Sequence, residues 1–131
     1  MKRLFLIRSA FFTAVVITIL HIGASVFFLY SYYWWFDIPL HFLAGICTGF
    51  LSLWLRFDAT KDTPARQLRT AVFGAFLFGV LWELFEYGSG ITQNGLGNYS
   101  LDTQKDLAID VLGAYGAYLF TVLFTRNKDT T

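Results

Sequence analysis

The sequence predicts an all-α fold, a four-helix transmembrane bundle with both termini in the cytoplasm. Hydrophobic residues make up 56% of the 131-residue chain and charged residues 15%, against about 25% in soluble domains. The apolar residues fall in long runs that are separated by polar segments. If each run crosses a membrane, nine of the ten Lys and Arg residues lie on the same side of that membrane. The chain is therefore expected to have lipid as the solvent for most of its surface.

A membrane span needs about 20 predominantly apolar residues. Such runs cover residues 10–30, 38–55, 70–87 and 107–124, and together they form a single polytopic membrane domain over residues 1–131. The first run is too long for the apolar part of a signal peptide and has no A-x-A cleavage pattern, so we expect a retained membrane anchor. The aromatic segment 32–35 after it is typical of a membrane interface.

The basic residues predict the orientation. They occupy the N-terminus, the connection between the second and third spans, and the C-terminus, and Lys105 alone lies on the other side. Cytoplasmic loops carry an excess of Lys and Arg, so both termini are expected in the cytoplasm. The net charge of +1 and the lack of a basic patch argue against a nucleic acid partner. Membrane lipids are the expected partners. The single cysteine, Cys47, excludes a disulfide framework and is interpreted as a small buried hydrophobe.

Six of the nine acidic residues gather at the predicted outer ends of the second, third and fourth spans, together with a histidine. With a helical rise of about 1.5 Å per residue, three of these polar residues lie roughly 5 Å below the outer boundary. The face of Asp37 and His41 continues through Gly45 and Gly49, and small residues mark close helix contacts. We therefore expect the polar groups to point into the bundle. The group comprises Asp37, His41, Glu83, Glu86, Asp102, Asp106 and Asp110.

So many carboxylates in one site require compensation by a divalent cation, bound protons, a cationic substrate or a water-filled vestibule. Oxygen ligands suit magnesium, calcium or manganese, and one histidine also permits zinc or iron. The candidate ligands of a divalent metal ion are His41, Glu83, Asp106 and Asp110. The candidate catalytic residues are Glu86, as a general base, and Asp37.

Structural alternatives exist for these residues. Asp37 precedes Ile38-Pro39 and fits a helix N-cap, and Asp102 or Thr103 fits the cap of the last helix. Glu86 lies near the membrane interface, so its charge can be explained by contact with water alone. The alternative role for His41 is a structural hydrogen bond. His21 is expected at mid-membrane with an interhelical hydrogen bond. The polar, glycine-containing segment 88–105 is predicted to be a loop that covers the acidic group.

The motifs resemble those of the VanZ-like membrane protein superfamily and, more closely, of a related uncharacterised bacterial inner-membrane family. That related family carries D-x3-H-F, [Y/W]-E-x2-E and D-T-Q-x-D motifs, whereas VanZ-like members have glutamine and asparagine where this chain has Glu86 and Asp110. The resemblance implies a multi-pass protein of the bacterial plasma membrane with a link to the cell envelope. It is carried by residues Asp37, His41, Phe42, Glu83, Glu86, Asp102, Thr103, Gln104, Asp106, Asp110 and Gly113.

Three function classes fit these observations. The first is a metal-dependent enzyme that acts on an envelope lipid or a lipid-linked substrate at the outer face. The second is a binding or transport module whose carboxylates carry protons or a cation. The third is a structural membrane protein without catalysis.

We predict that reporter fusions at the C-terminus and within segment 88–105 report opposite sides of the membrane, with the C-terminus in the cytoplasm, because the basic residues flank the cytoplasmic ends. Alkaline phosphatase and fluorescent protein fusions measure this in intact cells. An external C-terminus would overturn the predicted orientation.

Overall fold

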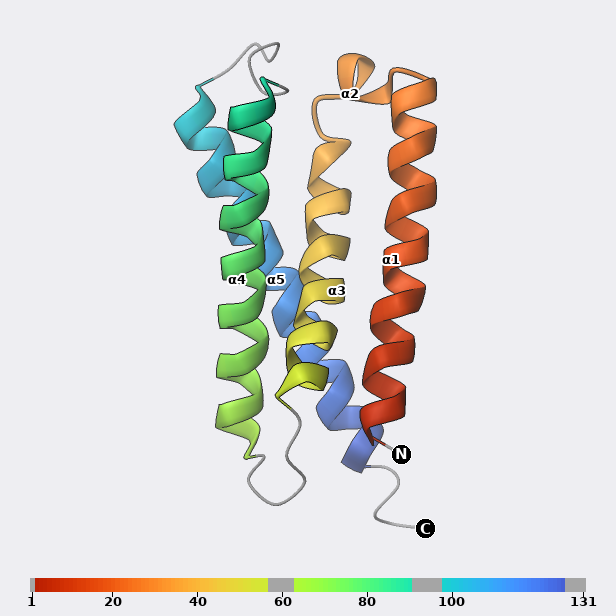
Figure 1. Ribbon diagram of the computed structural model, residues 1–131, viewed down its shortest axis with the longest axis vertical. Coiled ribbons are helices and arrows are strands. Elements are labelled where there is room, and N and C mark those ends of the chain that lie inside the picture. Colours follow the sequence, from red (N-terminus) through yellow and green to blue (C-terminus); the bar gives the residue numbers. More distant parts are fainter. Residues whose placement is uncertain (1, 57–62, 91–97, 127–131) are drawn as a thin grey trace.

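The computed structural model describes residues 2–56, 63–90 and 98–126, and this part of the chain is helical with no strand. Four long helices are α1 (Lys2–Val26), α3 (Asp37–Leu55), α4 (Pro64–Ser89) and α5 (Tyr99–Arg126), and α2 (Leu29–Tyr32) is a single turn (Figure 1). All four long helices are long and apolar enough to cross a membrane. The predicted all-α bundle of four spans is therefore confirmed.

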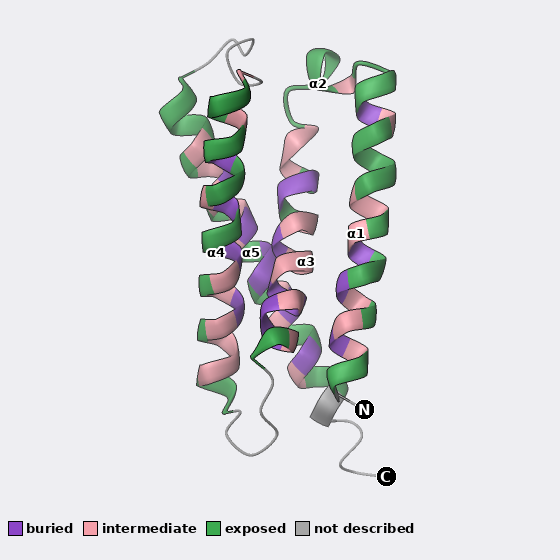
Figure 2. Ribbon diagram, viewed as in Figure 1, coloured by how far each residue is buried: buried purple, intermediate pink, exposed green. Residues whose placement is uncertain are grey.

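Helix α3 is the centre of the bundle and contacts α1, α4 and α5 (Figure 1). Helix α5 crosses α3 obliquely and reaches α1 at the end of the bundle where α1 begins. There the ring of Phe5 stacks on Phe124 with centroids 4.1 Å apart and on Phe120 at 5.9 Å. Buried residues line the facing sides of the helices, and the outward faces are largely exposed apolar residues that suit contact with lipid (Figure 2).

Glycines allow α3 and α5 to approach at backbone contact. A Cβ atom added to Gly45 would collide with the backbone oxygen of Asp110, and one added to Gly113 would collide with that of Phe42. One turn along, Gly49 packs against Ala114, where an added Cβ would lie 3.0 Å from the Cα atom. The expectation that Gly45 and Gly49 lie in a helix contact is confirmed.

Helix α1 differs from the predicted apolar run at both ends. It begins at Lys2, since Lys and Arg are good helix formers, and it ends at Val26. The chain turns at Phe28, which has a left-handed backbone with φ 55°, and α2 follows. A left-handed backbone is uncommon for a bulky residue, so hydropathy gave no sign of this turn.

The helix caps also differ from the sequence-based alternatives. Asp37 is the first residue of α3, and the N-cap position is Phe36 instead. No side-chain hydrogen bond caps this helix. Helix α5 begins at Tyr99, so Asp102 and Thr103 lie within it and the predicted cap at these residues is wrong. The Asn98 side chain accepts a hydrogen bond from the Ser100 amide instead, at 3.1 Å.

The segment that was predicted as a loop is partly helical. Helix α4 extends to Ser89 and closes with Gly90 in the left-handed conformation, with φ 71°, as is usual after a helix C-terminus. The first turns of α5 account for Tyr99 to Lys105. Residues 91–97 lie outside the described residues. The described part of the predicted lid therefore consists of two helix ends.

We predict that Gly45→Ala lowers the free energy of unfolding by about 1–3 kcal/mol, because the new methyl group would displace the α5 backbone. Gly23→Ala is the matched control, since nothing lies within 4 Å of a Cβ at that position. The control should be neutral or stabilising, because alanine favours a helix over glycine by up to about 1 kcal/mol. Thermal unfolding in detergent measures both variants. Equal midpoints would contradict the contact.

Candidate functional site

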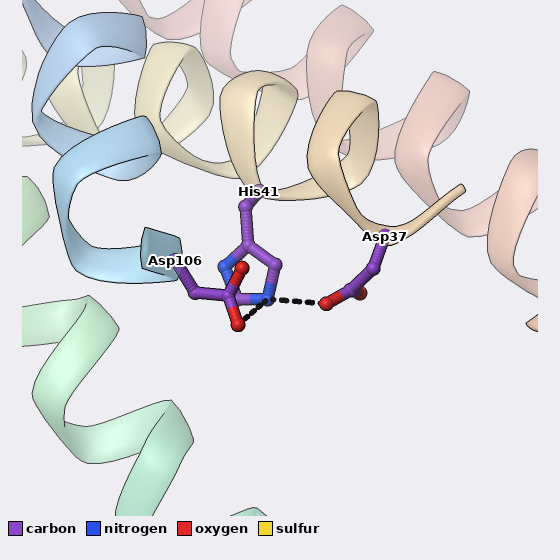
Figure 3. Close-up of side chains that lie close together, drawn as sticks. All are labelled: Asp37, His41 and Asp106. Carbon is purple, nitrogen blue, oxygen red and sulfur yellow. Dashed lines mark ion pairs between the residues drawn. The ribbon is translucent and has the colours of Figure 1, made fainter. Parts of the chain in front are cut away.

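His41 is the centre of the polar group. It lies in the second turn of α3 and is 6% exposed. Its Nε2 atom is 3.5 Å from Oδ2 of Asp37, one turn earlier in the same helix. The same nitrogen is 4.0 Å from Oδ2 of Asp106 on α5, which is 2% exposed. Figure 3 shows both carboxylates directed toward this nitrogen from two different helices.

The second ring nitrogen of His41 faces another carboxylate. Its Nδ1 atom lies 3.4 Å from Oδ1 of Asp110, which follows Asp106 by one turn of α5 and is buried. The Asp110 carboxylate packs on α4 at Gly79, where an added Cβ would lie 2.5 Å from Oδ2. Glycine at this position therefore provides the space that the carboxylate occupies.

Asp37, His41 and Asp106 form a group that could hold a metal ion. One donor atom from each lies within 4.8 Å of the other two. Two ligands at about 2.1 Å from a tetrahedral ion are about 3.4 Å apart, so the observed separations of 3.5 and 4.0 Å require only small movements. Asp37 was expected as a catalytic residue, and it also belongs to the group whose spacing could hold a metal ion.

Glu83 makes its described interactions with the first turns of α5. Its Oε2 atom accepts a hydrogen bond of 2.6 Å from the Thr103 hydroxyl. Its backbone oxygen accepts one of 3.2 Å from the Tyr99 hydroxyl. Glu83 is 5% exposed, and it is not in the group of three donors around His41. These bonds connect α4 to α5 one turn from Asp106.

Glu86 and Lys105 lie at the edge of the group. The Glu86 carboxylate is half-buried and accepts a hydrogen bond of 2.8 Å from the Trp82 indole. The Lys105 ammonium lies 2.7 Å from the exposed carboxylate of Asp102 and 3.3 Å from Oδ1 of Asp106. Lys105 therefore places one positive charge beside the buried carboxylate of Asp106.

Three buried carboxylate oxygens have no hydrogen-bond partner among the described residues. They are Oε1 of Glu83, Oδ1 of Asp106 and Oδ1 of Asp110. Oδ1 of Asp106 lies 3.3 Å from the Lys105 ammonium and Oδ1 of Asp110 lies 3.4 Å from Nδ1 of His41, so these two have ion-pair partners. Oε1 of Glu83 has neither kind of partner among the described residues. A buried polar atom without a partner is costly. The remaining acceptor capacity therefore suits a bound cation, bound protons or a hydrogen-bonding substrate.

Tyr30 and Thr103 are members of the site that sequence reasoning missed. Burial, with the charges of Asp37 and Glu86, raises the pKa of Tyr30 to about 12, so its hydroxyl stays protonated. That hydroxyl lies 2.7 Å from Nδ1 of His21, which is exposed and five residues before the end of α1, so the expected interhelical hydrogen bond of His21 joins α1 to α2. Tyr30 follows the irregular turn at Phe28, so its position in space could not be predicted from the sequence. Thr103 shares a helical face with Asp106, three residues on, and this spacing was a usable signal.

The comparisons with known proteins agree with the membrane fold. A family described as "Predicted membrane protein (DUF2238)" matches residues 2–127 of the chain. No curated protein matches. No solved structure matches either.

We predict that Thr103→Val lowers the free energy of unfolding by about 1–3 kcal/mol, because it removes the hydrogen bond to the buried Glu83 carboxylate. Thr48→Val is the control, since the Thr48 hydroxyl bonds to the Ala44 carbonyl of its own helix. The double variant Thr103→Val with Glu83→Leu should regain most of the loss. Thermal unfolding of all variants measures the coupling, and equal losses for Thr103→Val and Thr48→Val would contradict it.

Proposed function

The chain belongs to this family of predicted membrane proteins, and on that premise we propose that it is a metal-dependent membrane enzyme. Its centre is formed by Asp37, His41 and Asp106, and its substrate is the head group of an envelope lipid or a lipid-linked molecule. The observation that carries the proposal is the convergence of two carboxylates from separate helices on one nitrogen of His41.

The second nitrogen of His41 supports this assignment. Histidines that bind metal usually donate their other N–H group to a carboxylate or carbonyl, which fixes the ring orientation. Asp110 stands in that position, with Oδ1 3.4 Å from Nδ1. Asp110 therefore acts as a positioning residue for the ring, whereas the sequence suggested it as a direct ligand. Three protein ligands also leave coordination positions for water and substrate, as in catalytic metal sites.

The neighbouring side chains fit the chemistry of a head group. A divalent cation at this centre would polarise a phosphoryl or carbonyl oxygen and activate a water molecule. Glu86 can accept the proton of that water, since its carboxylate is held by the Trp82 indole and remains half-buried. Lys105 can neutralise a phosphate oxygen on the side of Asp106. The centre lies near the end of the bundle, at a depth that a lipid head group reaches.

The orientation and the motifs support an envelope substrate. If the basic ends of the helices face the cytoplasm, the centre faces the outside, where envelope precursors are processed. The resemblance to VanZ-like proteins points in the same direction, through the positions of Asp37, His41 and Glu83 in their motifs.

One observation favours a second candidate, a proton- or cation-coupled binding or transport module. Carboxylates face both nitrogens of His41, so a doubly protonated ring can bridge Asp110 and Asp37 without a metal ion. In that case the site carries charge rather than activating water. Divalent metal binding separates the two candidates.

We predict that the purified protein binds one equivalent of a divalent metal ion. Mn²⁺, Zn²⁺ or Mg²⁺ should raise its unfolding temperature after chelator treatment, because the ion compensates the buried carboxylates. Asp106→Asn should abolish this rescue, and Asp110→Asn should weaken affinity about 10–100-fold through the ring of His41. Isothermal titration calorimetry with metal analysis measures binding.

Asp102→Asn is the matched control, since Asp102 lies one turn earlier on α5 and is exposed. It should change affinity by less than about twofold, as expected for a screened surface charge. Stability that is insensitive to chelator, together with Asp106→Asn more stable than the wild type, would refute the metal site and favour the proton-binding candidate.

A further inference from the structure

A long groove lies between α3 and α4 and runs from the end of the bundle opposite to the acidic centre toward the middle of the bundle. It encloses about 910 Å³ and reaches Val111 of α5 at its inner end. Its lining along α4 runs from Arg66 to Phe78. At the base of the groove Gly74 packs directly on the Ser52 side chain, so the two helices meet there without a larger residue between them.

The dimensions of the groove fit one lipid chain of one leaflet. Arg66 and Phe78 are separated by twelve residues, which corresponds to roughly 18 Å of helix. Half of a hydrocarbon core of about 30 Å is about 15 Å. The inner part of the lining is apolar, with Phe73 and Leu77 exposed along it. A single acyl chain can therefore lie in the groove from the interface to the middle of the bilayer.

The end of the groove that lies farthest from the acidic centre is strongly basic. It is lined by Arg56 at the end of α3 and by Arg66 and Arg69 in the first turns of α4. Among the described residues, no carboxylate forms an ion pair with these three side chains. Arg69 bonds the Ala65 carbonyl through Nε at 3.2 Å, which leaves its terminal nitrogens for another acceptor. Guanidinium groups bind phosphate in a bidentate manner, so the end of the groove suits an anionic head group.

We propose that this groove binds one anionic phospholipid, with its phosphate on Arg66 and Arg69 and one acyl chain along Phe73 and Leu77. Basic pockets between transmembrane helices recognise anionic lipids through such charge complementarity. A second groove between α1, α3 and α5 has Arg8 as its one basic lining residue among those whose side chains the structure describes, whereas the α3–α4 groove has three, so we assign the anionic lipid to the α3–α4 groove. The proposal is independent of the acidic centre, which lies at the other end of the bundle.

The test uses the full-length protein in vesicles that contain a spin-labelled phosphatidylglycerol. Unlabelled dioleoyl phosphatidylglycerol or phosphatidylcholine then competes for the motionally restricted fraction. The wild-type protein should prefer phosphatidylglycerol over phosphatidylcholine. The double variant Arg66→Gln with Arg69→Gln should lose this preference by about fivefold for each arginine removed. Leu77→Trp, which fills the apolar part, should weaken both lipids and preserve their ratio.

Arg8→Gln is the matched control for Arg66→Gln alone, because each removes one positive charge at the same end of the bundle, but from different grooves. It should leave the lipid preference within about twofold of the wild type. An equal loss in Arg8→Gln would mean that bulk attraction of charge, rather than the groove, retains the lipid. An unchanged preference in the double variant, with unfolding temperature also unchanged, would overturn the proposal.

Discussion

The close approach of α3 and α5 is the constraint on which the rest of the structure depends. Glycine on both sides of the crossing, at Gly45 and Gly113, brings the two backbones into contact. This distance sets the imidazole of His41 between two successive turns of α5, where it meets Asp106 with one nitrogen and Asp110 with the other. A larger residue at the crossing would separate the helices and the polar group with them. The contact between α3 and α5 and the arrangement of the polar group around His41 thus depend on the same small residues.

Burial gives the polar group its character. In water, two unit charges about 4 Å apart interact by only about 1 kcal/mol, because the dielectric constant is high. Inside a helical bundle, each charge must be matched by a partner of opposite sign or by a proton. The described residues supply Lys105 for Asp106, the Thr103 hydroxyl for Glu83 and the ring of His41 for three carboxylates. Oε1 of Glu83 has neither a hydrogen bond nor an ion pair among the described residues, so the group keeps acceptor capacity for a further donor or cation.

The sequence was sufficient for features that depend on composition and helical period. Long apolar runs predicted the four spans, and the spacing from His41 to Gly45 predicted the contact face. The sequence could not predict what depends on local backbone geometry. The left-handed turn at Phe28 carries no glycine or proline, so nothing in the residue pattern marked the end of α1. Helix α5 begins at Tyr99, upstream of the expected cap, and within it the Thr103 hydroxyl lies against the Glu83 carboxylate, a pairing that depends on how α4 and α5 pack.

The depth of His41 would couple the proposed metal site to the membrane potential. His41 lies four residues after the start of α3, or roughly 6 Å along its axis, which is about one fifth of a hydrocarbon core of 30 Å. One elementary charge that crosses the full membrane gains about 2.3 kcal/mol per 100 mV. A divalent cation that enters to this depth from the positive side therefore gains about 0.9 kcal/mol at 100 mV, which raises its affinity about fivefold. On the proposed orientation and metal site, an energised membrane would load the centre more fully than detergent does, and collapse of the potential would lower its occupancy.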